Sequence, residues 1–137
     1  MNEPALRTYP HHEQPSIRQV MMPRDTNALG SIFGGIILSE IDLAAAVEAH
    51  KFHPSRIVTV AMDKVEFKQP VQVGDLVSFY TDTTRIGRTS ITAHVSVWAQ
   101  RRFGGGSFVH VTEADVTMVA VDEQGKPTSV LRPTSKA

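Results

Sequence analysis

The chain has 137 residues, of which 41% are hydrophobic, and its 14 Lys and Arg balance its 14 Asp and Glu. This length fits one domain that buries about two-thirds of its unfolded surface, and the zero net charge argues against nucleic-acid binding by phosphate attraction. Cysteine is absent, which excludes disulfides and cysteine-ligated metal sites. No apolar stretch reaches the ~18 residues of a membrane span and no signal-peptide core is found, so we expect a cytoplasmic protein without a membrane partner.

Taken from the N-terminus, the sequence predicts a short strand followed by one long helix. Residues 1–15 contain three prolines and are expected to form a flexible arm. A β-prone run at 16–22 ends at Pro23, which cannot donate to a continuing ladder. Turn formers follow, and then residues 34–50, rich in Ala, Leu, Ile and Glu and free of proline, predict the long helix.

Four β-prone segments rich in Val, Thr, Ile, Phe and Tyr come after the helix. Their separators are short, and parallel crossovers need a dozen or more residues, so neighbouring strands are expected to be antiparallel. We place the domain at 16–123 and a C-terminal tail at 124–137. The order predicts an α+β fold in which an antiparallel sheet wraps around one central helix. The four segments cover residues 56–67, 75–86, 89–101 and 108–121.

The predicted helix has no wholly polar face. Its large apolar side chains point in all directions when residues are placed at steps of about 100°, and four alanines between them would let a sheet approach closely. A helix that is apolar all round is expected to be buried. The large apolar residues are Ile36, Ile37, Leu38, Ile41, Leu43 and Val47.

Asp42 and two glycines at the helix start are the candidate chemical groups. A carboxylate among apolar neighbours is costly unless it is paired or shifted in pKa, and such groups gather at active sites, although a partly exposed helix residue fits too. Gly34 and Gly35 leave N–H groups that favour a developing negative charge, or form a turn without a ligand. Gly35 and Asp42 are two helical turns apart, roughly 10 Å along the axis, so both could line one groove.

Other polar residues leave a functional and a structural interpretation open. Asn27 could orient a water or a carbonyl, or could serve an Asx-type turn. Basic residues could bind the phosphates of a nucleotide-bearing substrate or could be solvated strand edges; they are Lys64, Lys68, Arg85, Arg88, Arg101 and Arg102. The six histidines show no metal-ligand spacing, so we expect no metal site.

The stretch RDTNALGSIFGG at residues 24–35, continuing to Asp42, resembles the hotdog-fold acyl-CoA thioesterases. It looks most like the bacterial YciA-type enzymes and the related cytosolic acyl-CoA hydrolases. Further matches are MDKVEFKQPV at 62–71, VGD at 73–75 and GRTS at 87–90. Two positions depart from the pattern: Ser31 stands where many members have Asp, which concerns loop anchoring, and Ile36 where many have Trp, which concerns the acyl pocket.

The resemblance implies hydrolysis of acyl-CoA to a free acid and CoA, by dimers that join their sheets edge to edge and assemble into tetramers or hexamers. It implies that Asp42 is the catalytic carboxylate, that Asn27 comes from across the dimer, and that the Gly35 N–H polarises the thioester carbonyl. No cofactor is expected besides the CoA of the substrate. The residues expected to bind substrate are Gly34, Lys64, Arg88, Thr89, Ser90, Arg101 and Arg102.

A carboxylate and an oxyanion hole can suffice for this chemistry, because a thioester carbonyl is already electrophilic. Asp42 could act as a general base on water, or could attack directly and form an anhydride. Two other functions stay open at this point: another hotdog acyl-CoA enzyme such as a hydratase, and a non-catalytic acyl-CoA-binding module.

Overall fold

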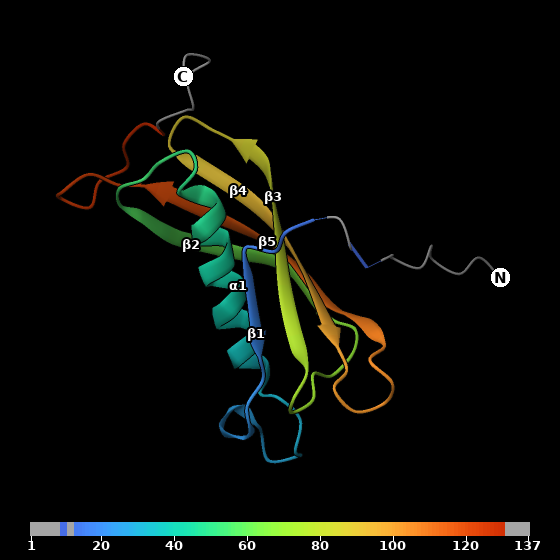
Figure 1. The fold of residues 1–137 in the computed structure, drawn as a ribbon. Helices are drawn as coiled ribbons and strands as arrows, with labels where there is room; N and C mark the ends of the chain where they lie inside the picture. Colours follow the sequence, from blue (N-terminus) through green and yellow to red (C-terminus); the bar gives the residue numbers. More distant parts are fainter. Residues whose placement is uncertain (1–8, 11–12, 131–137) are drawn as a thin grey trace.

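One long helix lies across one face of a five-stranded antiparallel sheet in the computed structural model, which describes residues 9–10 and 13–130 (Figure 1). The expected α+β architecture is confirmed, with the long helix and the four strands after it at the predicted places. In chain order the elements are β1 (Ile17–Val20), the 3-10 helix η1 (Pro23–Asp25), α1 (Gly34–Ala49), β2 (Ile57–Phe67), β3 (Leu76–Ile86), β4 (Ser90–Gln100) and β5 (Phe108–Ala120).

The strand order is β1-β3-β4-β5-β2, so β1 and β2 form the two edges of the sheet. The register of β2 against β5 shifts between Asp63 and Glu66, and Lys64 at this bulge has a φ of 58°. The other side of β2 faces no strand of the described chain, and four large apolar side chains along it are exposed: Val58, Val60, Val65 and Phe67. A long apolar edge of this kind is a template for pairing with another chain.

The core lies between α1 and the inner face of the sheet. Strand alternation directs Val95 and Val97 of β4 toward the helix, and Ala44 and Ala45 are fully buried, so the small helix residues do let the sheet approach. The expectation of a helix buried all round is wrong for the single chain. Leu43 and Val47 on the side away from the sheet are 56% and 47% exposed.

Glu48 carries a buried charge between α1 and β3. Its side chain accepts hydrogen bonds from Thr81 at 3.2 Å and Thr83 at 2.6 Å, and Lys51 lies 2.7 Å away. Burial by itself raises the pKa of Glu48, but the hydrogen bonds from Lys51 and the threonines outweigh it, and the pKa is lowered. The carboxylate therefore stays ionised and ties the helix to the sheet.

Short parts of both expected terminal segments contact the sheet. Tyr9 stacks on Phe108 with ring centroids 3.9 Å apart and meets Trp98 edge-on at 5.7 Å. At the other end, the Val130 N–H donates to the Arg88 carbonyl at 2.9 Å. Most of the expected arm and the end of the expected tail lie outside the described residues.

Candidate functional site

Asp42 stands in the third turn of α1 and points toward the edge strand β2. The Thr59 hydroxyl donates a hydrogen bond to its Oδ1 at 2.5 Å. Thr59 is opposite Met118 in the β2–β5 register, on the face of the sheet that packs against the helix. Within the described residues, Oδ2 of Asp42 has no hydrogen-bond partner. One oxygen is therefore fixed and the other is free to act on a ligand.

Replacing Thr59 by valine is expected to lower kcat about tenfold or more, because a hydrogen bond to a charged group contributes about 1.5–3 kcal/mol. If Thr59 acts only by positioning the Asp42 carboxylate, the effect should fall on kcat rather than on KM. Thr59→Ser keeps the hydroxyl and should restore most of the rate. Equal kcat for the valine and serine variants would show that the hydroxyl has no such role.

The first turn of α1 presents free backbone N–H groups beside this carboxylate. Phe33 is the N-cap and makes no side-chain capping bond, and in the described part of the chain the N–H groups of Gly34 and Gly35 have no acceptor. The Phe33 ring fills the space next to Gly35, where a Cβ would come within 2.5 Å of it. Gly35 and Asp42 are seven residues apart and so lie on the same side of the helix.

Asn27 holds its own loop together. Its Oδ1 accepts hydrogen bonds from the N–H of Leu29 at 2.8 Å and of Ser31 at 3.3 Å, and its Nδ2 donates to the Ser31 hydroxyl at 3.0 Å. Ser31, which stands where many family members have Asp, thus takes part in anchoring the loop. No hydrogen bond joins Asn27 to Asp42 among the residues whose positions are described, so the structure of one chain does not bring these two candidates together.

An apolar hollow of about 260 Å³ lies beside the helix start, between the loop before α1 and the segment after β2. It shares Gly34 with the site above. Ile36, at the second departure from the family pattern, does not line it. Its apolar lining consists of Ile32, Ile37, Phe67, Pro70 and Val71.

The basic candidates are spread over the sheet rather than clustered. Arg88 lies in the turn before β4 and Arg101 just after the same strand, which puts them roughly 33 Å apart or more. Lys64 points toward Asp115, at 3.7 Å, on the face of the sheet opposite the helix. One nucleotide therefore cannot contact all of these residues on one subunit.

Arg101 is already engaged in a buried ion pair. Its guanidinium lies 2.5 Å from Asp75, which is 1% exposed, and also donates to the Pro70 carbonyl at 2.9 Å. Asp75 in addition accepts the Gln72 N–H at 2.9 Å. These contacts give Arg101 a structural task at the start of β3.

Replacing Arg101 by alanine is expected to lower the free energy of unfolding by about 3–5 kcal/mol, because Asp75 would be left buried and unpaired. Urea unfolding measures the loss. Arg102→Ala next to it is the matched control, since Arg102 forms no ion pair among the described residues, and it should change stability little. A loss no larger than that of the control would contradict the structural role.

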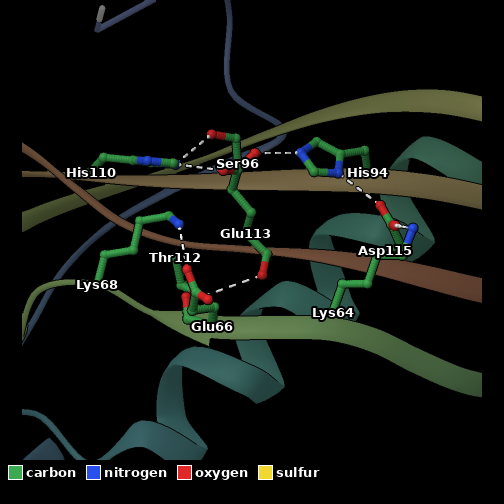
Figure 2. Close-up of polar contacts among 9 residues, drawn as sticks. All are labelled: Lys64, Glu66, Lys68, His94, Ser96, His110, Thr112, Glu113 and Asp115. Carbon is green, nitrogen blue, oxygen red and sulfur yellow. Dashed lines mark hydrogen bonds and ion pairs between the residues drawn. The ribbon is translucent and has the colours of Figure 1, made fainter. Parts of the chain in front are cut away.

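A polar network lies on the outer face of β4 and β5, away from the helix (Figure 2). Both ring nitrogens of His94 face carboxylates, Nδ1 at 2.7 Å from Asp115 and Nε2 at 2.8 Å from Glu113. Partial burial lowers the pKa of His94, but the hydrogen bonds and charges of Asp115 and Glu113 outweigh it, and the pKa is raised. Since ionised carboxylates only accept, both contacts can be hydrogen bonds at the same time only when the ring is an imidazolium.

Asp115→Asn is expected to lower the pKa of His94, because it removes a charge that stabilises the imidazolium. Because the pKa of His94 is raised, its contacts with the two carboxylates stabilise the folded state fully below the unfolded pKa of about 6.5. This contribution to the free energy of unfolding is lost as the pH rises through the folded pKa. NMR titration of the ring measures the pKa, and urea unfolding over the same range follows the stability. Glu123→Gln removes the same charge from an exposed turn; if it moved the His94 pKa equally, the contact with Asp115 would not be the cause.

The described residues contain no group of three or more His, Asp or Glu side chains that could hold a metal ion. His50 turns its ring back to the Ala46 carbonyl at 2.7 Å, and His53 is buried with no hydrogen-bond partner for its ring among the described residues. In the same part of the chain, no helix combines the length and the apolar character needed to cross a membrane.

The sequence and structure match known proteins over most of the chain. A model of the thioesterase superfamily matches residues 29–102, and the acyl-CoA thioester hydrolase YciA of Escherichia coli is 39% identical over 113 residues, 81% of this chain and 86% of that protein. The chain belongs to the thioesterase superfamily. The span that matches the superfamily contains Gly35, Asp42 and Thr59.

Similar solved structures identify the fold of this thioesterase. A hexameric hotdog fold thioesterase of Campylobacter jejuni superposes with a TM-score of 0.82 at 48% identity, over 86% of this chain and 90% of that one. An acyl-CoA hydrolase of Staphylococcus aureus in complex with butyryl coenzyme A superposes with a TM-score of 0.76 at 28% identity, over 85% and 70%. The expected hotdog fold is confirmed.

Proposed function

We propose that this protein is an enzyme that hydrolyses the thioester of acyl-CoA to a free acid and CoA. The observation that carries the proposal is a helix carboxylate with one oxygen fixed by Thr59 and the other free, two turns after unpaired backbone N–H groups. The family supports it, because relatives at about 40% identity are acyl-CoA thioester hydrolases.

Asp42 is the general base in the proposed reaction. Its free Oδ2 takes a proton from a water molecule as the water oxygen attacks the thioester carbon. The N–H of Gly35, at the positive end of the α1 dipole, stabilises the resulting oxyanion. Collapse of this intermediate breaks the carbon–sulfur bond, and the CoA thiolate leaves and takes up a proton. Direct attack by Asp42 would need a shift of a carboxylate that Thr59 holds in place.

Two subunits complete each site in this proposal. The free apolar edge of β2 is suited to pair with β2 of a second copy about a two-fold axis, which runs the strands antiparallel. The Ile57 end of one strand then lies beside the Phe67 end of the other. Within one subunit, Ser90 and Val58 both pair with Val119, so the 88–90 turn lies at the Ile57 end of β2. In the dimer, the partner's 88–90 turn therefore lies at the Phe67 end of this subunit's β2, near the start of α1.

The partner subunit also brings its own loop around Asn27 toward Asp42. Support comes from two structures of the Staphylococcus aureus hydrolase in which an aspartate and an asparagine are replaced by alanine, at positions 15 residues apart. Asn27 and Asp42 have the same separation. We further propose that Arg88, Thr89 and Ser90 contact CoA, that the dimers assemble into hexamers like those of the Campylobacter jejuni relative, and that the protein works in the cytoplasm.

Thiol release from a panel of acyl-CoAs tests the function. We expect continuous release of free CoA, with one free acid per thiol, in the presence of excess chelator. Addition of water to an unsaturated acyl-CoA without thiol release would indicate a hydratase instead. Binding of acyl-CoA with no chemical change would indicate a binding module.

A further inference from the structure

The loop before α1 is a closed hairpin that holds a leucine at its tip (Figure 1). At its base the Phe33 N–H donates to the Asp25 carbonyl at 2.8 Å, and nearer the tip the Asn27 N–H donates to the Ser31 carbonyl at 2.8 Å. Leu29, at the tip, is 93% exposed. Fixing these residues costs conformational entropy, and in the single chain the leucine buries almost no surface in return. The hairpin 25–33 is thus suited to bind a partner through Leu29.

The side chain of Asn27 is used inside the same hairpin. Its Oδ1 accepts from the N–H groups of Leu29 and Ser31, and its Nδ2 donates to the Ser31 hydroxyl. A side-chain amide offers two acceptor sites and two N–H groups, so these contacts leave one N–H for another subunit. Asn27 therefore mainly shapes the loop, and the side chain that the loop presents to a second subunit is Leu29.

Two-fold pairing of the β2 edges brings this hairpin to the helix of the other subunit. The hairpin ends at the helix start near the Phe67 end of β2, where a Cβ on Gly34 would stand 3.6 Å from the Phe67 ring. In the dimer proposed above, this end lies beside the Ile57 end of the partner's β2, where Thr59 binds Asp42. Because α1 lies mainly over β3 and β4, the β5 and β2 strands of both subunits separate the two helices, which leaves space for the hairpin.

We propose that Leu29 of each subunit packs against Leu43 of the other subunit, an inference that rests on the shared site proposed above. Leu43 follows Asp42 directly, with Cα atoms about 3.8 Å apart, and is 56% exposed in the single chain. Leu29 is two residues from Asn27 and so within about 7 Å of it. A hairpin that places Asn27 at Asp42 of the other subunit therefore brings the two leucines within reach of each other.

The contact gives Asp42 an apolar cover from the other subunit. Two packed leucines keep bulk water away from one side of the carboxylate, and the attraction between charges and N–H dipoles is stronger where water is excluded. The contact also removes two exposed leucine side chains from water, which stabilises the dimer. Two-fold symmetry forms it twice in each dimer.

Disulfide cross-linking tests the contact, because the chain has no cysteine and every thiol is an introduced one. In the double variant Leu29→Cys/Leu43→Cys, mild oxidation should link two subunits into a dimer that a reducing agent separates again. A disulfide needs Cα atoms about 4.4–6.8 Å apart, so the link reports direct contact. Phe103→Cys/Leu43→Cys is the matched control, since Phe103 is 71% exposed in the turn between β4 and β5, and it should form no link.

Sedimentation of Leu29 variants gives a second measurement. Leu29→Ser should raise the subunit dissociation constant about tenfold or more, the scale of one buried leucine, and should lower kcat even where the subunits stay assembled. Leu29→Met keeps an apolar side chain and should change both little. Phe103→Ser should leave both unchanged. Since Leu29 is exposed in the single chain, these replacements should not disturb the fold of the subunit.

Several results would overturn the inference. One is the absence of a link in the double variant, both on oxidation and with a short bis-maleimide. Another is a link in Leu43→Cys alone, which would mean that the two α1 helices meet, or in Leu29→Cys alone, which would mean that the hairpin tips meet. Equal dissociation constants for Leu29→Ser and Leu29→Met would also contradict it. Absence of thiol release from every acyl-CoA would instead overturn the proposed function and leave the cross-link, so the two failures can be told apart.

Discussion

Replacing Asp42 by asparagine is expected to lower kcat by about 10² to 10⁴, the usual cost of losing a general base. Asparagine keeps the size of the side chain and can still accept the Thr59 hydrogen bond through its carbonyl oxygen. It cannot take a proton from water. The affinity for CoA, measured by calorimetry, and the unfolding midpoint in urea should therefore stay close to those of the unaltered protein.

Glu40→Gln is the matched control for Asp42→Asn. Glu40 stands two residues earlier on the same helix and so points about 160° away from Asp42. Its replacement removes the same charge and should change kcat by no more than a factor of about two, because substitutions of exposed residues have small effects. A near-normal kcat in Asp42→Asn, or an equal loss in both variants, would contradict the assignment of the base.

Mixing two inactive variants is expected to restore about a quarter of the activity if each site needs one residue from each subunit. The variants are Asn27→Ala and Asp42→Ala, combined after reversible dissociation. With random exchange, half of the dimers are hybrids, and each hybrid has one site with both defects and one with neither. The recovered thiol-release rate measures the fraction of intact sites.

Two controls accompany the mixing experiment. Each variant treated alone must stay inactive, and unfolding curves must show that Asn27→Ala still folds, because Asn27 also holds the loop to Leu29 and Ser31. If subunit exchange is demonstrated and no activity returns, Asn27 and Asp42 do not work together across the dimer.

The fold follows from the sequence because its elements depend on local patterns. The helix has a continuous run of strong helix formers, and the turns between the later strands are too short for parallel crossovers. The sequence pattern of the helix does not indicate which of its apolar faces packs against the sheet. Leu43 and Val47 are as apolar as Ile37 and Ile41 but remain exposed in the single chain, because one sheet covers only one side of a helix.

The site was predictable only where its residues lie on one element. Gly35 and Asp42 share a helix, so their spacing fixes their relation. The sequence does not reveal Thr59, because its contact with Asp42 depends on how β2 is placed against the helix, and a threonine between valines is typical of any strand. The ion pair between Arg101 and Asp75 likewise joins residues 26 apart, and charge alone does not reveal such a partner.

Turnover of acyl-CoA in water enriched in heavy oxygen tests the central claim most directly. Hydrolysis transfers one water oxygen to the free acid, so over many turnovers each acid molecule should carry one heavy oxygen and one equivalent of free CoA should form with it. Asp42→Asn protein at the same concentration should produce less than about a hundredth of this labelled acid. Unlabelled product, no product, or equal amounts from both proteins would contradict hydrolysis by Asp42.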